Sequence, residues 1–537
     1  MVCIDDALTI PGLLERRAAE DPATAFCSFE GHTLTFGEVD VAVNRLANGL
    51  IELGIEHGDR VAVMLPNHPD HILTILALMK AGATWVPLNV HLRGPSLAYV
   101  LEHADPRAVI ADARYREALG PPLAARAPAW TIWRGDSAET GDDGEVPFEH
   151  LRAHPSSASP GYRGGAHDEV CISYTSGTTG EPKGVIMTDR MLRASAVGAR
   201  LGGGIGDGDV LLVWEPLYHV GGSEVVVLGL MQRIRLVLVE RFSAARFWDQ
   251  VRAAGATHVH HLGGILQVLM KQPPGERDRD HPVRVFWGGG CTGEVWRPFE
   301  ERFGVRVREV YGMTEASSIT TVNGEGRVGS IGRPVPYFAV RVVDDRGADV
   351  GPGTLGELII QEREPGLIMR GYFRNPEATA AALRDGWLFT GDLARVDEEG
   401  FLYYCGRKTD SVRRRGENIS AWEVERVVDE HPAVERSALV GVATDVGEQD
   451  LKLFVKPAAG CAPDPAGLID WCQERLPRFQ VPRYVAYVDE FDLTPTLRIR
   501  KERLSRSTDG CWDRERPAPK LVDERPAATP IPQPEQS

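Results

Sequence analysis

The sequence has no pair of cysteines at the Cys-x-x-Cys spacing, although it contains eight cysteines among its 537 residues. Structural zinc sites usually take their ligands from such pairs, so their absence argues against a zinc-binding module. Disulfide frameworks belong mainly to small secreted domains, and a chain of this length can bury a large core without one. We therefore expect reduced thiols and a cytoplasmic protein.

Excess positive charge and long apolar runs are also absent. Lys and Arg number 60 against 76 Asp and Glu, which gives a formal net charge of −16. Binding to a phosphate backbone needs a basic face, and the one dense basic cluster is Arg413–Arg415. No run of 18 apolar residues exists, and no basic stretch leads into an apolar one at the N-terminus. We therefore expect neither a nucleic-acid partner, nor membrane insertion, nor a signal peptide.

The chain does contain a long alternation of helical and strand patterns. Apolar residues at helical spacing alternate with short apolar segments; the helical patterns cover 39–53 and 69–81, and the apolar segments 60–65, 84–87 and 108–111. This alternation is typical of parallel sheets with helices on both faces. Because it recurs between 209 and 287, we predict an α/β fold in which two α/β subdomains stack.

Two changes in composition and secondary-structure pattern divide the rest of the chain. After Gly329, short strand patterns between turn residues predict a small β-rich subdomain. After a polar junction, mixed helix and strand patterns predict a small α+β domain, and from about Ser507 the chain becomes polar and proline-rich, which is typical of disorder. The predicted organisation is an N-terminal domain over 1–405, a hinge over 406–410, a C-terminal domain over 411–506 and a disordered tail over 507–537.

The segment Tyr174–Val185 carries the strongest chemical signal, and it reads Tyr-Thr-Ser-Gly-Thr-Thr-Gly-Glu-Pro-Lys-Gly-Val. Closely spaced glycines let backbone N–H groups approach an anion, Ser and Thr add short donors, and Lys183 adds a positive charge. The pattern predicts a polyphosphate-binding loop. It is not the P-loop of common NTPases, because no Gly-Lys pair followed by Ser or Thr ends it. The alternative is a flexible surface loop of biased composition.

Three further motifs follow this loop along the chain: Tyr311-Gly-Met-Thr-Glu315, Thr390-Gly-Asp392 and Gly406-Arg407. Together with the loop they resemble the motifs of the adenylate-forming superfamily, which includes acyl-CoA synthetases, luciferases and the adenylation domains of peptide synthetases. The resemblance covers about residues 10–505. Within the superfamily the chain looks most like the crotonobetaine/carnitine-CoA ligase branch, and the supporting segments are 216–219, 246–249, 372–376 and 415–420.

The resemblance implies how the site would hold ATP. The phosphates would be bound by Lys183 and by the loop residues Thr175, Ser176, Gly177, Thr178, Thr179 and Gly180. Glu315 would bind Mg²⁺ with help from Thr175, and the metal would bridge phosphate oxygens. The nucleotide would also contact Gly289, Gly290, Glu309, Tyr311, Gly312, Thr314, Asp392, Tyr404 and Arg407.

The acyl pocket is expected around His219, which by resemblance lies near the reacting carboxylate. The run His258-Val-His-His261 is expected to adjoin it, with one or two histidines in a polar pocket wall or, alternatively, as satisfied core histidines. A metal site is disfavoured, because no acidic or cysteine partner lies nearby in the sequence. Glu224, which interrupts an apolar stretch, is a second candidate for the polar pocket wall.

The sequence departs from the family pattern near its C-terminal end. A Gly-Lys pair is usual there, and its lysine contacts the reacting carboxylate and the α-phosphate; here the pair is Leu497-Arg498, with Lys501 as a candidate substitute. Arginine keeps the positive charge but aims its donors differently. The hinge position, usually Asp or Lys, is Thr409. Arg415 and Gly416 fall in the loop that lines the pantetheine channel in the family, where close relatives tend to have Gly-Gly. The resemblance implies that they contact CoA; Arg415 would bind a CoA phosphate or, alternatively, narrow the channel.

The resemblance predicts an AMP-forming acid–thiol ligase that uses ATP, Mg²⁺ and CoA. It would activate a small carboxylic acid as an acyl-adenylate, release pyrophosphate and then form a thioester. The departures leave a second hypothesis open: an enzyme of secondary metabolism that passes the activated group to a non-CoA nucleophile, by amide formation or by activating nitrite for diazotisation. A nucleotide-binding pseudoenzyme is disfavoured by the intact motifs. The acid and the oligomeric state stay open, with a homodimer as one option.

Overall fold

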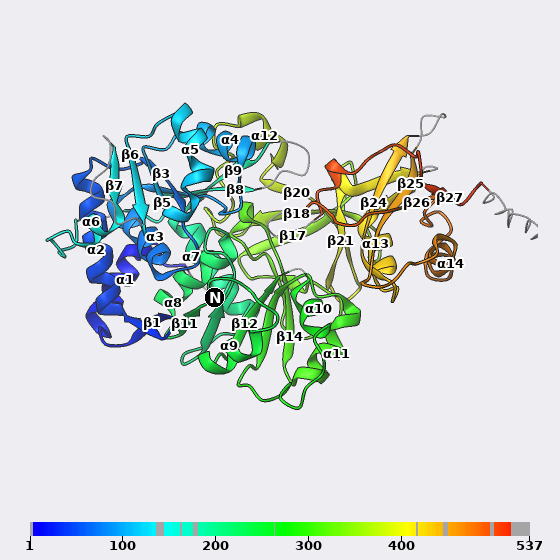
Figure 1. The fold of residues 1–537 in the computed structure, drawn as a ribbon, viewed down its shortest axis with the longest axis horizontal. Helices are drawn as coiled ribbons and strands as arrows, with labels where there is room; N and C mark the ends of the chain where they lie inside the picture. The colour runs from blue at the N-terminus through cyan, green and yellow to red at the C-terminus, as the bar shows by residue number, and fades with distance from the viewer. Residues whose placement is uncertain are drawn as a thin grey trace, which may run out of the picture. The chain divides into compact units, whose positions relative to one another are not determined.

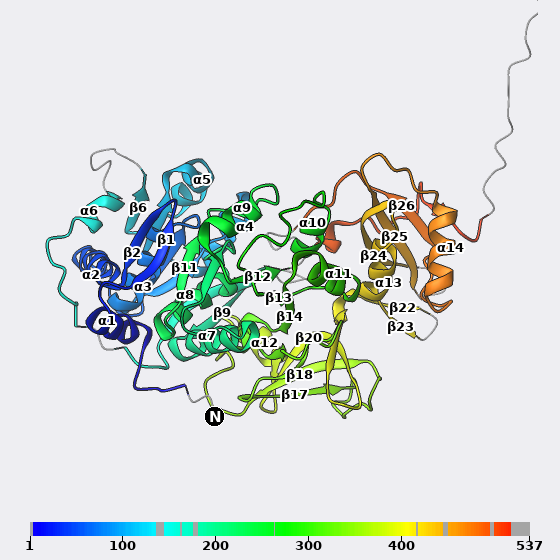
Figure 2. The ribbon, with the colours of Figure 1, turned by 90° about the horizontal axis from the view of Figure 1, so that it is seen from below.

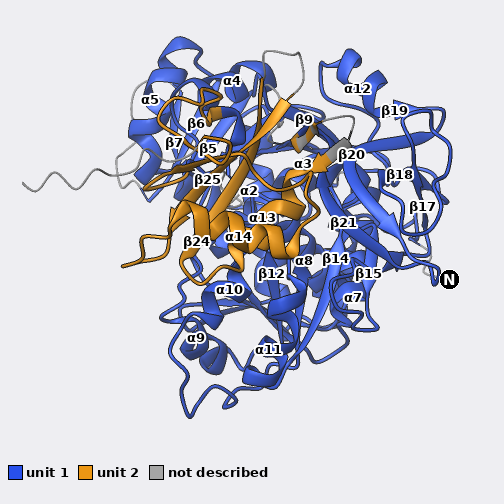
Figure 3. Ribbon diagram, turned by 90° about the vertical axis from the view of Figure 1, so that its right-hand side faces the viewer, with its two compact units in different colours: residues 1–409, 492–502 blue, residues 410–491, 503–537 orange. Residues whose placement is uncertain are grey.

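The computed structural model describes residues 4–135, 144–161, 164–175, 181–262, 264–414, 417–443, 449–493 and 499–516. The chain divides into two compact units, which Figure 3 colours separately. Unit 1 comprises residues 1–409 and 492–502, and unit 2 comprises residues 410–491 and 503–537. The segment that contains Lys501 therefore groups with unit 1, although the sequence places it in the C-terminal domain. Among the described residues, no helix combines the length and the hydrophobicity that a membrane crossing requires.

The first sheet of unit 1 has seven strands in the order β7-β6-β5-β3-β4-β8-β9. Its strands are β3 (Arg60–Met64), β4 (Thr84–Pro87), β5 (Ala108–Asp112), β6 (Trp130–Arg134), β7 (Glu145–Pro147), β8 (Glu169–Thr175) and β9 (Lys183–Thr188). All neighbouring pairs are parallel except the β8–β9 hairpin. This hairpin encloses the predicted phosphate-binding loop.

Side chains of this sheet alternate between two hydrophobic layers, as the two-residue repeat of a strand requires. Val61 and Val63 join the cluster that includes helices α2 (Phe36–Glu52) and α3 (Pro69–Ala81). Ala62 and Met64 join the cluster on the other face, with α4 (Gly94–Ala104) and α5 (Arg116–Ala125). Burial on both faces explains why the strand patterns of the sequence are almost wholly apolar.

The second sheet has nine strands in the order β16-β15-β14-β13-β12-β10-β11-β1-β2. Its strands are β1 (Ala25–Phe29), β2 (His32–Thr35), β10 (Val210–Val213), β11 (Arg235–Leu238), β12 (His258–Leu262), β13 (Val285–Gly289), β14 (Arg306–Tyr311), β15 (Thr321–Asn323) and β16 (Arg333–Pro334). The run from β1 through β11, β10, β12 and β13 to β14 is parallel, so the carboxyl ends of these strands meet at one edge. Strand β1 belongs to this sheet although the first sheet follows it in the chain.

Helices cover both faces of the second sheet as well. Leu211 and Val213 pack in the cluster of α7 (Asp189–Gly203) and α8 (Val220–Met231), and this cluster also contains α2 and α3. Leu212 and Phe286 pack on the opposite face, with α9 (Phe247–Ala254), α10 (Ile265–Met270) and α11 (Gly293–Phe303). One helical layer thus lies between the two sheets (Figure 1 and Figure 2). The predicted α/β class with stacked subdomains is confirmed.

A third, antiparallel sheet forms the predicted β-rich part of unit 1. Its strands are β17 (Phe338–Val343), β18 (Gly356–Glu362), β19 (Leu383–Arg384), β20 (Trp387–Val396) and β21 (Leu402–Arg407). The register of β20 and β21 pairs Asp392 with Arg407 across the two strands. Three short helices complete this unit: α1 (Ile10–Glu20), α6 (Phe148–Arg152) and α12 (Pro376–Ala382).

Unit 2 has the predicted α+β composition. Its elements are β22 (Ser411–Arg414), β23 (Glu417–Ser420), α13 (Ala421–Asp429), β24 (Val434–Ala443), β25 (Gln449–Pro457), α14 (Pro465–Arg475), β26 (Tyr484–Tyr487) and β27 (Trp512–Asp513). The last strand differs from expectation, because the sequence assigns residues from 507 onward to a disordered tail. Trp512 packs on the core of unit 2 and β27 extends its sheet beside β26, so order continues to at least Arg516. Residues 517–537 lie outside the described residues.

Candidate active site

The predicted nucleotide residues gather at the carboxyl edge of the second sheet. Gly289 ends β13 and Tyr311 ends β14, and Glu215, for which no role was predicted, follows the end of β10. In open α/β sheets ligands bind beyond the carboxyl ends of parallel strands, because loops and helix starts converge there. Residues far apart in the chain are therefore brought to one edge by the topology alone.

The ends of the phosphate-binding loop are held by the β8–β9 hairpin. Thr175 and Lys183 are register partners, and the Thr175 hydroxyl donates to the backbone oxygen of Lys183 at 3.4 Å. Next to them, a Cβ added at Gly184 would lie 2.8 Å from Ile172 and 3.2 Å from Tyr174, so only glycine fits without displacement. The loop residues Ser176, Gly177, Thr178, Thr179 and Gly180 lie outside the described residues.

Lys183 and Glu315 are linked through Tyr372. The Lys183 Nζ lies 5.1 Å from the centroid of the Tyr372 ring, and the Tyr372 hydroxyl donates to Glu315 Oε1 at 2.9 Å. Glu315 is buried, with 6% of the residue exposed. Burial raises the pKa of its carboxyl group, while the Tyr372 hydrogen bond and the nearby Arg407 charge oppose that shift. No role was predicted for Tyr372, although its segment contributed to the family resemblance.

Asp392, Arg407 and Tyr311 form a second linked group. The Tyr311 hydroxyl donates to Asp392 Oδ2 at 2.7 Å, and Arg407 Nε forms an ion pair with Asp392 Oδ1 at 2.8 Å. The Tyr404 ring lies 6.1 Å from that of Tyr311, centroid to centroid. Burial and the adjacent Asp392 carboxylate raise the pKa of Tyr311 well above its ordinary value, so Tyr311 stays a neutral donor. The structure thus brings together four residues that the sequence assigns to the nucleotide.

The Glu309 carboxylate binds the backbone after β13 and is therefore not free to bind a ligand. Its carboxylate accepts the backbone N–H groups of Gly290 and Cys291. Burial raises the pKa of Glu309 to about 8, against the lowering effect of these two hydrogen bonds. Glu309, which the resemblance assigns to the nucleotide, therefore fixes the turn after β13.

A tight turn follows Tyr311. A Cβ on Gly312 would lie 1.5 Å from the backbone oxygen of Ser318, so the two segments touch there and glycine is required. Ser317 and Ser318 adopt positive φ angles of 48° and 64°, which are uncommon for residues other than glycine. Half-buried Thr314 begins the short 3₁₀ helix Thr314–Ala316, which carries Glu315. Consecutive strained residues beside a candidate site are a common feature of functional loops.

The four-residue histidine run divides into three environments. His258 interacts through Nδ1 with the Thr257 hydroxyl at 2.9 Å. His260 pairs with Glu215 and packs on Trp287, with ring centroids 4.4 Å apart. His261 is fully buried, and burial lowers its pKa to about 3, so its ring is neutral. Within the described ranges no group of three or more His, Cys, Asp or Glu is placed to hold a metal ion.

His219 and Glu224 lie on α8, with His219 as its N-cap residue. Burial lowers the pKa of His219, partly offset by the Glu215 charge. Burial also raises the pKa of Glu224 well above its ordinary value, although a hydrogen bond from Ser318 opposes the shift. Of the two predicted pocket-wall residues, Glu224 is therefore buried and His219 half-buried, and buried Glu215 lies near them without having been predicted.

The residues fit a magnesium ion that arrives with a nucleotide. Mg²⁺ is usually held by one or two carboxylates together with substrate phosphates, rather than by a protein cage. Glu315 supplies one carboxylate, and Tyr372 occupies its Oε1. The Thr175 hydroxyl lies near the loop end and retains an acceptor lone pair. This donor set suits a hard cation that takes its remaining ligands from phosphate oxygens and water.

The predicted residues of the C-terminal segment are only partly described. Lys501 begins the 3₁₀ helix Lys501–Arg503, and its N–H donates to the Ile499 oxygen at 3.1 Å. Arg498, Arg415 and Gly416 lie outside the described residues.

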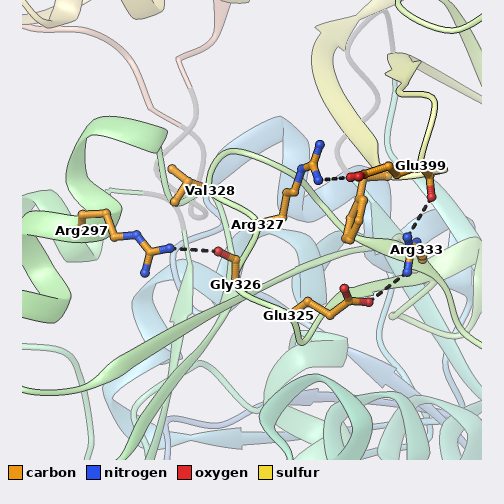
Figure 4. A pocket seen from close by; sticks show the side chains of 8 residues that line it. Arg297, Glu325, Gly326, Arg327, Val328, Arg333 and Glu399 are labelled. Carbon is orange, nitrogen blue, oxygen red and sulfur yellow. Dashed lines mark hydrogen bonds and ion pairs between the residues drawn. The ribbon is translucent and has the colours of Figure 1, made fainter.

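A separate surface cleft in unit 1, of about 810 Å³, lies away from these groups (Figure 4). Its charges neutralise one another: Arg327 pairs with Glu399, and Arg333 pairs with Glu325. Both arginines also pack on the Phe401 ring, at 4.9 and 4.0 Å from its centroid. Because these groups already have partners, the cleft offers no unmet charge for a substrate.

Fold and site together define an ATP-using α/β enzyme in which the β8–β9 hairpin strands carry Lys183 beside a buried carboxylate, Glu315, and an Asp392–Arg407 ion pair lies near Tyr311 at the end of β14. The chain belongs to the AMP-binding enzyme family, whose sequence profile matches residues 14–373. The profile of the AMP-binding enzyme C-terminal domain matches residues 423–497.

Curated relatives span nearly the whole chain. A crotonobetaine/carnitine–CoA ligase of Escherichia coli O8 (strain IAI1) is 32% identical over 458 residues, which cover 83% of this chain and 88% of that protein. A protein of the same name from Salmonella choleraesuis (strain SC-B67) is 31% identical over 480 residues, 86% of this chain and 92% of that one.

Solved structures share the fold. ATP-bound MatB from Rhodopseudomonas palustris superposes with a TM-score of 0.82 at 26% identity, covering 92% of this chain and 98% of that chain. The o-succinylbenzoate CoA synthetase of Bacillus subtilis, in complex with an acyl-adenylate intermediate, gives a TM-score of 0.80 at 25% identity, covering 91% and 97%. The family resemblance inferred from the motifs is confirmed.

Proposed function

We propose that this protein is an ATP- and Mg²⁺-dependent acid–thiol ligase that converts a small carboxylic acid to its CoA thioester. The observation that carries the proposal is the linkage of Lys183, Tyr372 and Glu315, which puts a cation and a buried carboxylate beside the loop-bearing hairpin. Relatives named as CoA ligases support the same reaction, as do similar structures solved with ATP and magnesium or with an acyl-adenylate.

In the first step a substrate carboxylate oxygen attacks the α-phosphorus of ATP, the bond to the bridging oxygen breaks, and pyrophosphate leaves. A general base is unnecessary, because a carboxylic acid is already ionised at neutral pH. The main barrier is electrostatic, since two anions must meet in line. Lys183 and Arg407 supply positive charge, and Asp392 accepts hydrogen bonds from the ribose hydroxyls. Bound Mg²⁺ would neutralise phosphate charge, with Glu315 as its carboxylate ligand.

In the second step the sulfur of CoA attacks the acyl carbon, the bond to the AMP oxygen breaks, and AMP and the thiol proton are released. We assign Arg415 and Gly416 to CoA binding, on a C-terminal domain over 411–506 joined at 406–410. Replacing Arg415 with Ala should raise the KM for CoA and leave pyrophosphate release from ATP and acid unchanged. An unchanged KM would remove Arg415 from the CoA site.

The proposed function is tested by product analysis across small polar, aromatic and medium-chain acids, with and without CoA. We expect pyrophosphate release that depends on the acid, and one acyl-CoA per AMP when CoA is present. If pyrophosphate release does not depend on CoA and mass spectrometry detects no acyl-CoA, the ligase assignment fails. The second hypothesis, transfer of the activated group to a non-CoA nucleophile, would then be favoured. Nitrite with an aromatic amine is the first combination to examine.

Arg498 is proposed to replace the lysine that is usual in this family. The Arg498→Lys variant should then adenylate its acid at a comparable or higher rate, and the Arg498→Ala variant should lose most of that rate. A collapse in Arg498→Lys would show that arginine geometry is specifically needed. An unchanged rate in Arg498→Ala would transfer the role to Lys501 or to no C-terminal cation.

The proposal also places the enzyme in the cytoplasm and in secondary metabolism. Cys27, Cys171, Cys291, Cys405 and Cys472 are buried free thiols, which suits a reducing compartment. An Arg-, Ala- and Gly-rich, Lys-poor composition suits secondary metabolism. Cell fractionation of the producing organism would test the compartment, and recovery of the protein outside the cytosol would overturn that assignment.

A further inference from the structure

Two aromatic side chains of helix α4 contact the β8–β9 hairpin, which encloses the phosphate-binding loop. Tyr99 and His103 lie four residues apart on this helix, and their rings stack with centroids 5.4 Å apart and an interplanar angle of 17°. His103 Nδ1 forms a hydrogen bond of 2.7 Å with the Tyr174 hydroxyl, near the end of β8. Glu181, two residues before β9, is hydrogen-bonded to Tyr99. Helix α4 thus holds residues on both sides of the loop residues.

The His103 ring also contacts the segment that carries Tyr372. Its centroid lies 5.7 Å from that of the Phe373 ring, in an edge-to-face arrangement. Phe373 in turn donates its backbone N–H to the Gly184 oxygen at 2.7 Å, and Gly184 is the register partner of Tyr174. The imidazole therefore connects β8 directly, and β9 through Phe373, with the segment that orients Tyr372.

Arg374 attaches the same segment to the end of α4. Its Nη1 donates to the His103 backbone oxygen at 3.1 Å, and its Nη2 forms an ion pair with Asp105 at 3.6 Å. The φ angle of Arg374 is 50°, which is uncommon for residues other than glycine and persists where neighbouring contacts hold it. These contacts fix the chain two residues after Tyr372, the side chain that meets the proposed metal ligand.

The contact between His103 and Tyr174 is a hydrogen bond between neutral groups. Burial lowers the pKa of His103, and the Arg374 charge lowers it further, against the opposing effect of the Glu181 carboxylate. The imidazole is therefore neutral at pH 7, as a tyrosine hydroxyl is. A hydrogen bond of this kind changes an equilibrium constant by up to about tenfold.

We propose that His103 is a positioning residue of the adenylation site, which holds Tyr174 and Phe373 so that the hairpin and Tyr372 are preorganised for the phosphates of ATP. This inference rests on the proposed function, in which Lys183 on this hairpin meets those phosphates. Because ATP carries β- and γ-phosphates and AMP does not, the contact should favour the binding of ATP over that of AMP. A side chain that only stabilised the fold would affect both nucleotides or neither.

The test measures the Kd for MgATP and the Kd for AMP by titration calorimetry, which needs no acid substrate. His103→Phe keeps an aromatic ring and removes the hydrogen-bonding atom, so the Kd for MgATP should rise about tenfold while the Kd for AMP is unchanged. His103→Asn puts an amide group where Nδ1 lies and should restore most of the affinity for MgATP. Native affinity in His103→Phe together with a loss in His103→Asn would show that the ring only packs, and would overturn the inference.

A double variant shows whether His103 acts through Tyr174. Tyr174→Phe removes the other half of the hydrogen bond, so it should raise the Kd for MgATP by the same factor as His103→Phe. The two substitutions combined should have no larger effect than either alone, because residues that share one contact are not additive. A further rise of about tenfold in the double variant would contradict the inference. If His103→Phe does not fold, the ATP and AMP affinities of Tyr174→Phe decide the question.

The matched control is His431→Phe in unit 2. His431 Nδ1 also accepts a hydrogen bond, from the Ala433 N–H at 3.2 Å, and its ring also lies edge to face with an aromatic side chain, Trp471. This variant should leave both Kd values unchanged. Native affinities in every variant would overturn the inference and leave the ligase function standing. A native protein that binds no MgATP would instead overturn both.

Discussion

The nucleotide-facing residues and the buried polar atoms of His219 and Glu224, at α8, differ in how their polar groups are satisfied. Lys183, Glu315, Asp392 and Arg407 each have a protein partner in place, mostly through Tyr372 or Tyr311. At α8, by contrast, Glu224 Oε2 and His219 Nε2 are buried without a hydrogen-bond partner. The first arrangement is preorganised for a reaction that every substrate shares. The second involves residues predicted to line the acyl pocket, so selectivity among acids is expected to reside there.

The largest effect is expected when the negative charge of Glu315, which faces the nucleotide, is removed. In Glu315→Gln the carboxylate that would hold the metal becomes a neutral amide, whereas the Tyr372 hydroxyl keeps an acceptor. We expect pyrophosphate release to fall about 100-fold or more for every acid tested, because a transition-state charge contact is lost. The control is Glu325→Gln in the surface cleft of Figure 4, which should retain native rates. A selective loss for some acids only would contradict the shared role.

The next largest effect is expected at Asp392. The Asp392→Asn variant weakens the Arg407 ion pair and the acceptor for ribose hydroxyls, so the KM for ATP should rise about 10-fold to 100-fold, in line with the strength of charged hydrogen bonds. The preference among acids should not change. Steady-state kinetics at varied ATP measure both quantities. Tyr311→Phe, which removes one donor to the same carboxylate, should show a smaller rise; an effect equal to that of Asp392→Asn would show that the tyrosine, not the charge, dominates.

Substitutions at Tyr372 test whether activity depends on the side chain that connects Lys183 and Glu315. The Tyr372→Phe variant keeps the ring beside Lys183 and removes the hydroxyl that meets Glu315. We expect a loss in kcat of about 10-fold, smaller than for Glu315→Gln, because the carboxylate is less well oriented but still present. Tyr372→Leu removes the ring as well and should lower the rate further. Native activity in Tyr372→Phe would show that the linkage is structural only.

These contacts also mark what sequence reasoning could and could not supply. Helix α3 was predicted with its observed bounds, because Pro69 sits in its first turn and Gly82 ends it at a φ of 78°. The motif residues Lys183, Glu315, Asp392 and Arg407 were found because chemistry and order along the chain point to them. Their partner Tyr372 was not assigned, since its role comes from a tertiary contact that no local pattern reports.

Long-range pairing explains the other misses. Strand β1 pairs with β11, although all strands of the first sheet lie between the two in the chain. The periodicity of a strand does not indicate which other strand lies next to it. Strand β27 pairs with β26 inside a segment whose composition suggests disorder, because Trp512 supplies apolar burial that an average over the tail hides. The Glu215–His260 pair likewise joins two segments that the sequence keeps apart. Composition and period describe single elements, whereas these features belong to the assembled core.

The smallest expected effect concerns stability rather than rate. Glu309 has an ordinary pKa of 4.5, and burial raises it to about 8, so the folded chain binds this proton more tightly than the unfolded chain. The stability that Glu309 contributes is therefore present below pH 4.5 and is lost as pH rises to 8, by about 1.4 kcal/mol per pH unit. Glu309→Gln should become more stable relative to the native protein between pH 6 and 8, with no further gain above. A difference in melting temperature that does not vary with pH would show that Glu309 is ionised throughout.

The most direct test of the central claim is a two-stage reaction of the native protein with ATP, Mg²⁺ and an accepted acid, first without CoA and then with CoA added. The account predicts that acyl-adenylate bound to the enzyme reaches one equivalent in the first stage. In the second stage it should disappear as equal amounts of AMP and acyl-CoA form, measured by mass spectrometry after rapid quenching. Acyl-adenylate that persists after CoA is added, or pyrophosphate released without any adenylate, would contradict the assignment.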